Sequence, residues 1–185
     1  MTYAKADGYK IRNQSVLHFL TFTIMGWIDI FTRQCYRDLM LDSFRFCQEK
    51  KGLKIGVWVI MSNHIHTICR AEHNNLSDII RDFKTFTCKA IYEMIQKEKE
   101  SRREWLNYMF SYFANGTNAN KQIKIWTNNN HPEEIFSQDF LKTKMDYIHN
   151  NPVRAGLVFN ASDYIYSSAM DYEGKKGLID LSYLE

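Results

Sequence analysis

Hydrophobic and polar positions follow two different periods along the first half of the chain, and each period predicts one kind of element. Aromatic and β-branched residues fill HFLTFTI, at residues 18–24, which is typical of a strand. Apolar residues recur at helical spacing over residues 35–50, which predicts a helix. The β-branched run at residues 54–61 and the stretch HIHTICR, at residues 64–70, predict two strands joined as a hairpin by a short turn.

The second half of the chain begins with the clearest helical pattern. Apolar residues form one continuous stripe over residues 76–96. The mixed charges of KEKESRR, at residues 97–103, indicate a solvated helix end. The other expected elements are a strand at residues 106–113, a loop at 114–121, a short strand ending at Trp126, a helix at 131–150 stopped by Pro152, and a strand near 178–181. This order predicts an α+β fold in which two helices cover one face of a sheet.

Composition narrows the class of protein without choosing a function. The chain has 185 residues, 45% of them hydrophobic, and only 2 Pro and 8 Gly, which indicates a globular rather than a disordered protein. No apolar run approaches the ~20 residues needed to cross a bilayer, and residues 1–14 have no apolar signal core, so we expect a cytoplasmic protein. The net charge of +3 neither requires nor excludes nucleic acid. The cysteines contain no C-x-x-C pair and are expected to be reduced thiols: Cys35, Cys47, Cys69 and Cys88.

His64 and His66 form the first candidate site. Residues i and i+2 of a strand point to the same face, so both imidazoles project together while Ile65 faces the other way. Two adjacent imidazoles are half of a typical transition-metal site. A His-x-His pair also occurs by chance on protein surfaces, and this alternative stays open here. Cys69 is expected to face away from the pair on the same strand.

Tyr147 and Asn151 form the second candidate site. Four residues apart on the expected helix, they share one face, one turn apart. A tyrosine hydroxyl can act as a nucleophile, and an asparagine carbonyl oxygen can bind a metal. In the competing interpretation, Tyr147 packs in a stripe with Phe136 and Phe140, and Asn151 caps the helix before Pro152.

The two candidate sites are more informative together than apart. A metal held by His64, His66 and Asn151 would keep positions open for a phosphate oxygen and withdraw charge from the phosphorus. Tyr147, one turn before Asn151, would lie beside the same metal. The combination predicts cleavage of a phosphodiester through a covalent phosphotyrosine.

These residues resemble a known family, the HUH single-tyrosine transposases, and especially their REP-associated tyrosine transposase branch. The likeness lies in VWVIMSNHIHTI, at residues 57–68, and in LSDIIRDFKTFTCKAI, at residues 76–91. It continues in DYIHNNPVRAGLV, at residues 146–158, followed by DYIYSSA, at residues 163–169. It covers about residues 17–171, the core of the catalytic domain that the family would have here.

The resemblance implies one catalytic domain over residues 1–185, built on a ferredoxin-like antiparallel sheet with helices packed on one face. It implies cleavage and rejoining of single-stranded DNA through a 5′-phosphotyrosine on Tyr147. His64, His66 and Asn151 would bind Mg²⁺ or Mn²⁺, and related insertion-sequence enzymes have Gln where this chain has Asn151. The expected partner is single-stranded DNA, including hairpin-forming repeats, and the protein is expected to be a monomer or a homodimer.

Basic residues near these motifs are expected to contact DNA phosphates. They are Arg81, Lys84, Lys89 and Arg154. Solvated helix faces are the alternative for each. Three other functions stay open: a domesticated DNA-binding module without cleavage, a replication or conjugation nickase, and a metal hydrolase that combines the histidine pair with a carboxylate such as Glu72. The remaining histidines receive no role: His18, His73, His131 and His149.

Overall fold

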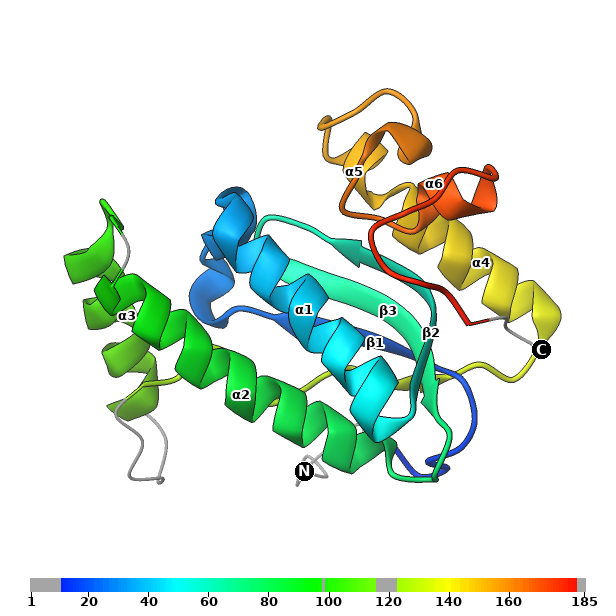
Figure 1. Cartoon of the computed structure of the whole chain (residues 1–185), viewed down its shortest axis with the longest axis horizontal. Helices are drawn as coiled ribbons and strands as arrows, with labels where there is room; N and C mark the ends of the chain where they lie inside the picture. Colours follow the sequence, from blue (N-terminus) through cyan, green and yellow to red (C-terminus); the bar gives the residue numbers. More distant parts are fainter. Residues whose placement is uncertain (1–10, 98, 116–122, 183–185) are drawn as a thin grey trace, which may run out of the picture.

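The computed structural model describes residues 11–97, 99–115 and 123–182. These residues form an antiparallel sheet with the strand order β2-β3-β1-β4, surrounded by helices (Figure 1). The strands are β1 (His18–Thr23), β2 (Leu53–Ile60), β3 (His64–Ala71) and β4 (Glu133–Glu134). The α-helices are α1 (Gln34–Lys51), α2 (Leu76–Lys97), α3 (Arg103–Asn115), α4 (Gln138–His149), α5 (Asn151–Arg154) and α6 (Ala169–Tyr172), and the 3₁₀ turns are η1 (Met25–Trp27), η2 (Ile30–Thr32) and η3 (Ala161–Asp163). The predicted α+β class with an antiparallel sheet is confirmed.

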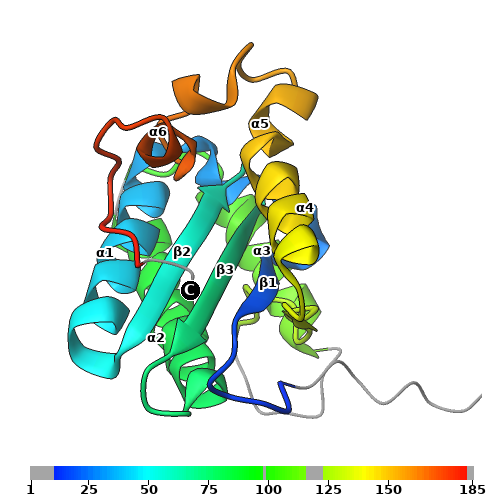
Figure 2. The ribbon, with the colours of Figure 1, turned by 90° about the vertical axis from the view of Figure 1, so that its right-hand side faces the viewer.

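The sheet carries helices on both faces. Helices α1 and α2 cover one face, as predicted, whereas α4 lies on the opposite side (Figure 2). Ile65 and Cys69 of β3 therefore pack toward α1 and α2, and Ile68 packs toward Ile148 of α4. The sequence placed all packed helices on one face, and α4 is the correction. One apolar residue, Ile148, is fully buried in α4, so the pattern of this short helix does not reveal which face it covers.

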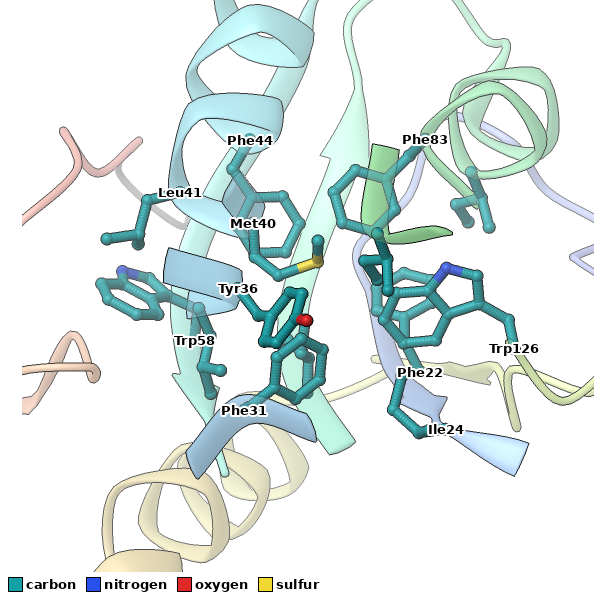
Figure 3. Packing of buried hydrophobic residues seen from close by; sticks show 14 of the residues in the cluster. Phe22, Ile24, Phe31, Tyr36, Met40, Leu41, Phe44, Trp58, Phe83 and Trp126 are labelled. Atoms are coloured by element: carbon teal, nitrogen blue, oxygen red, sulfur yellow. The ribbon is translucent and has the colours of Figure 1, made fainter. Parts of the chain in front are cut away.

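The core on the α1 and α2 face is the larger one and is rich in aromatic side chains (Figure 3). The rings of Phe44 and Phe83 stack with centroids 4.9 Å apart and join α1 to α2. Trp126 packs against Phe83 and donates from Nε1 to Thr87 Oγ1 over 3.0 Å, which satisfies a buried donor. This core fixes the position of the sheet. All four cysteines are free thiols, and no described helix has both the length and the apolarity to cross a membrane.

Helix α3 replaces the strand predicted at residues 106–113, so that prediction was wrong. Its buried residues Leu106, Phe110 and Ala114 recur every four positions, which is helical spacing. The aromatic content of the segment favoured a strand and obscured this period. Most of the loop predicted at 114–121 lies outside the described residues.

The segment predicted as a solvated helix end also differs from expectation. Glu100 is only 6% exposed and accepts hydrogen bonds from Arg33 Nη1 over 2.6 Å and from Tyr36 OH over 3.0 Å. A carboxylate is stable in such a place only when it is paired and hydrogen-bonded. Glu100 therefore fixes the start of α1 to the connection between α2 and α3.

The C-terminal third shows three smaller corrections. The helix predicted from residue 131 begins at Gln138, because the Ser137 side chain caps it by accepting from Phe140 N over 3.1 Å. The residues before it form β4, which pairs with β1. Residues 178–181 form no strand, and Trp126 forms only an isolated bridge with Ile24.

Residues 166–168 cover the outer edge of β2. Ile60 N donates to Tyr166 O over 2.9 Å, and Ser168 N donates to Trp58 O over 3.0 Å. The Ser168 hydroxyl is 2.9 Å from His149 Nε2 at the end of α4. This segment therefore satisfies an exposed strand edge and fastens α4 to the sheet.

Candidate functional site

His64 and His66 lie together at the start of β3, on the face that carries α4. Their ring centroids are 4.6 Å apart. Ile65 and Cys69 are buried on the opposite face, so the alternation predicted for this strand is confirmed. The sheet therefore presents two imidazoles side by side, as one half of a metal site requires.

Each imidazole has a polar neighbour at Nδ1. His64 Nδ1 is 2.6 Å from Asn63 Oδ1, and His66 Nδ1 is 2.9 Å from Thr21 Oγ1. Oδ1 only accepts, so His64 carries its proton on Nδ1 and has a lone pair at Nε2. The Thr21 hydroxyl can accept from His66 in the same way. Hydrogen bonds of this kind orient metal-binding histidines in proteins.

Burial keeps both histidines in the form that binds metals. Desolvation lowers the pKa of His64, and desolvation together with the nearby charges of His64, Lys144 and Arg154 lowers the pKa of His66 to about 3. Both rings are therefore neutral near pH 7, which is the protonation state of a ligating imidazole.

Tyr147 lies on α4 above the histidine pair. Its ring centroid is 5.2 Å from that of His66 and 5.9 Å from that of Phe19, and the side chain is 40% exposed. Arg154 lies over the outer side of the ring at 4.5 Å and donates to the Tyr147 carbonyl over 2.8 Å. Tyr147 is therefore partly packed, with Phe19 and Arg154 as neighbours in place of the stripe that the competing interpretation expected, and it lies beside the histidines.

Asn151 lies just beyond Tyr147 but on a separate helix. Helix α4 ends at His149, and Asn150, with φ −82° and ψ 0°, leads into the short helix α5, where Pro152 is tolerated in the first turn. Asn151 is half-buried and its carbonyl accepts from Ala155 N over 3.0 Å. Asn151 therefore follows Tyr147 across a helix junction, and not within one helix as the sequence had predicted.

The donor set fits a divalent cation that accepts mixed ligands. His64 and His66 supply neutral nitrogens, and an asparagine side chain supplies a neutral oxygen. The described residues contain no group of three or more His, Cys, Asp or Glu side chains that could hold a metal. Glu72 follows the far end of β3, where it pairs with Lys54 over 3.0 Å, so it does not join the histidines.

The four basic residues predicted to contact DNA fall into two places. Arg154 lies at Tyr147, whereas the other three lie on α2, on the opposite side of the sheet. Arg81 pairs with Asp78 and Asp82, and Lys89 is exposed near Glu93. The structure therefore does not bring the four together.

Lys84 points inward rather than to solvent. It donates to Thr127 O over 2.6 Å and to Asn130 Oδ1 over 2.7 Å, and burial, aided by the charge of Lys124, lowers its pKa to about 8. With Arg81 it lines an open groove of about 800 Å³ between α2 and residues 123–130.

Two neighbours of the histidines, Phe19 and Asn63, were missed in the sequence. Phe19 stacks on His66 with centroids 5.3 Å apart, and Lys144 pairs with Glu133 over 2.7 Å while lying 4.5 Å above the Phe19 ring. Of these, Asn63 alone could have been inferred from the sequence, because it directly precedes His64. His149 Nε2 lies 2.9 Å from the Ser168 hydroxyl, so this histidine is not part of the pair at Tyr147.

The fold and this arrangement define an α+β protein with a histidine pair and a tyrosine on one sheet face, and comparison identifies its family. A family model described as "Transposase IS200 like" matches residues 18–129, well over half of the chain. The chain therefore belongs to the IS200-like transposase family. The match includes His64 and His66, and Tyr147 lies beyond it.

The fold is similar to that of a solved structure described as the REP-associated tyrosine transposase bound to a REP hairpin. The TM-score is 0.60 at 17% sequence identity, over 96% of this chain and 92% of the other. At this identity the similarity establishes the fold. A search of curated proteins found no match.

Proposed function

We propose that this transposase-family protein cleaves and rejoins single-stranded DNA, with Tyr147 as the nucleophile. The observation that carries the proposal is the 5.2 Å separation of the Tyr147 and His66 rings. These residues come from α4 and β3, which lie far apart in the sequence. A phenol, a histidine pair and an open surface beside them supply the groups needed for phosphoryl transfer to a tyrosine.

His64, His66 and Asn151 would hold the cation, Mg²⁺ or Mn²⁺. On ligand grounds, two imidazoles favour Mn²⁺. A cation bound there supplies positive charge for the phosphate oxygens of the substrate. Asn63 and Thr21 keep the imidazoles oriented for this role, and the low pKa of His66 keeps that ring unprotonated.

The reaction conserves the number of phosphoester bonds. Tyr147 Oη attacks the phosphorus and loses its proton, the bond from phosphorus to the 3′ oxygen breaks, and that oxygen takes up a proton. A second 3′-OH then attacks the 5′-phosphotyrosine and restores the phenol. Because one ester replaces another in each step, joining needs no external energy source. Arg154, whose guanidinium lies 4.5 Å over the Tyr147 ring, would bind a phosphate oxygen.

Hairpin-forming single strands are the substrate we propose, since the similar solved structure is described as bound to a REP hairpin. Arg81, Lys84 and Lys89 lie on the other side of the sheet from Tyr147, so they would contact a different part of the DNA. The catalytic core would comprise residues 17–171, act in the cytoplasm, and function as a monomer or homodimer.

The test is formation of a covalent adduct. Labelled oligonucleotides carrying a hairpin with single-stranded flanks, and the matching duplexes, are incubated with Mn²⁺ and separated on denaturing gels. We expect an adduct with the single strand, which Tyr147→Phe abolishes and Tyr108→Phe, at an exposed tyrosine on α3, retains. His64→Ala should abolish cleavage while DNA binding persists.

Two results would change the conclusion. An adduct that survives in Tyr147→Phe removes this residue as the nucleophile. Hairpin binding by the wild-type protein without any adduct favours the other candidate function, a DNA-binding module of transposase descent without cleavage.

A further inference from the structure

The turn η1, directly after β1, holds two consecutive residues in the left-handed region. Gly26 has φ 64° and Trp27 has φ 56°. Glycine adopts this conformation freely, but for a bulky aromatic residue it is strained. Strain of this kind persists where surrounding contacts enforce it, and such positions cluster at functional sites.

Contacts from three directions enforce this turn. A Cβ at Gly26 would lie 2.6 Å from the ring of Phe113 on α3, so only glycine fits there. Met25 N donates to Ile125 O over 2.7 Å. Asn63 Nδ2 donates to Trp27 O over 3.2 Å. These contacts together hold the backbone of Trp27 in place.

The side chain of Trp27 gains little protein contact in return. It is 67% exposed, whereas Trp58 and Trp126 are buried in the core. Its indole lies with one edge toward His64, at a centroid distance of 6.2 Å and an angle of 71°. A largely exposed indole on a held backbone therefore lies next to His64, at the end of the histidine pair.

We propose that Trp27 stacks on an unpaired nucleobase of the DNA strand, next to the phosphate that is cleaved. The inference rests on the proposed function, because it assumes that a single strand lies across His64 and Tyr147. Aromatic side chains bind single strands by stacking, and every base offers the π-face that this requires. An exposed indole on a fixed backbone makes such a contact at a low entropic cost.

The same contacts tie the proposed base site to the histidine. Asn63 donates to the Trp27 carbonyl and accepts from His64 Nδ1. One side-chain amide therefore positions both the stacking residue and the imidazole. This link is what we expect if base and phosphate of neighbouring nucleotides must be held in register.

The test measures DNA binding without divalent cation, so that cleavage plays no part. Fluorescence anisotropy with a labelled hairpin bearing a single-stranded flank gives the dissociation constant. We expect Trp27→Ala to weaken binding by between about 5-fold and 150-fold, and Trp27→Phe by less, because phenylalanine keeps a stacking face. Trp105→Ala, at the other exposed tryptophan, on α3, should bind like the wild type.

Abasic substitutions identify the base. One abasic position in the flank should weaken binding to the wild-type protein by a similar factor and leave binding to Trp27→Ala almost unchanged. Trp27→Gly controls for folding, because it removes the side chain while glycine adopts the positive φ without strain. Its thermal unfolding should stay close to that of the wild type while its DNA binding falls.

Each contrary result has its own meaning. If Trp27→Ala and Trp105→Ala bind as tightly as the wild type, the stacking role is wrong and the proposed function stands. If every abasic position weakens the wild type and Trp27→Ala equally, Trp27 acts through the fold and not through a base. If the wild-type protein binds no single strand, the proposed function itself fails.

Discussion

The carboxylate of Glu100 is buried and is stable there only because it is paired and hydrogen-bonded. Its side chain is 1% exposed and accepts from Arg33, Tyr36 and the backbone N–H of Arg102. Burial alone would raise the pKa of this carboxyl, but the hydrogen bonds and the charge of Arg33 outweigh burial and hold the pKa below 4.5. Glu100 is therefore ionised in the folded protein at neutral pH.

Replacing Glu100 should destabilise the protein in a way that depends on pH. Glu100→Ala leaves the buried Tyr36 hydroxyl without its acceptor, and we expect a loss of about 1–3 kcal/mol in the free energy of unfolding at pH 7. The Glu100 carboxyl binds a proton less readily in the folded protein than in the unfolded chain, because folding lowers its pKa. The contribution of the carboxylate is therefore complete above pH 4.5 and is lost as the pH falls through the lower folded value.

Urea unfolding between pH 3 and 7 measures this effect. The stability difference between wild type and Glu100→Gln should shrink as the pH falls below 4.5. Glu93→Gln is the matched control, since Glu93 is half-exposed and its lysine partners are 3.8–4.0 Å away. A difference for Glu100→Gln that stays constant over this range contradicts the prediction.

Among single residues, the sequence revealed the histidines, whose side chains can bind a metal. It did not reveal the neighbouring residues that hold these histidines in place. The period of a strand was enough to place His64 and His66 on one face. Thr21 and Phe19 lie across the sheet on β1, and their contacts with His66 depend on the register of two strands that are distant in sequence. Neither residue type is distinctive, so nothing in the linear order singled them out.

Helix α4 carries Tyr147, the proposed nucleophile, and one residue caps its first turn. Ser137 accepts from Phe140 N, and beyond this cap Leu141, Met145 and Ile148 pack against the smaller hydrophobic cluster, with Ile148 alone fully buried in α4. Loss of such a cap typically costs about 1 kcal/mol. Because α4 buries little else, this cost should act on the helix itself.

We expect Ser137→Ala to speed amide hydrogen exchange in α4 by roughly five-fold, the equivalent of about 1 kcal/mol. Ser137→Asp should restore slow exchange, because aspartate is also a good cap and its charge suits a helix N-terminus. Exchange measured by mass spectrometry on peptides from residues 138–149 decides the outcome. Equal exchange in wild type and Ser137→Ala shows that the cap does not limit α4.

Long elements were predicted well from their period, and short or irregular ones were not. Helix α2 buries seven residues along one stripe, and this stripe is visible in the sequence. The two residues of β4 carry no period at all, and they pair with β1 only because the chain is brought back there by tertiary contacts. Helix α3 was misread because aromatic residues favour strands on average, while their spacing here follows a helix.

The whole molecule is asymmetric about its sheet. Six residues of α1 and seven of α2 are buried on one side, whereas α4 on the other side buries only Ile148. The tyrosine therefore lies on the side with the smaller buried cluster, and the histidines lie on the sheet itself.

This asymmetry predicts a hierarchy of opening. Amides of α4 should exchange with solvent faster than those of α1 and α2, because α4 can detach with the loss of a small cluster. Hydrogen exchange of the wild-type protein, resolved by peptide, tests this. Protection of α4 equal to that of α2 means that both faces open only with global unfolding.

The side chain of Asn63 connects the proposed base-stacking residue to the histidine pair. Its amide donates to the Trp27 carbonyl and accepts from His64 Nδ1, so a change in the position of one residue changes the hydrogen bond to the other. Thermodynamic linkage makes this influence mutual. By whatever factor a base stacked on Trp27 changes the affinity of His64 for a cation, a cation on His64 changes the affinity of Trp27 for the base by the same factor. We therefore expect the occupancies of the two proposed positions to be coupled through this one asparagine.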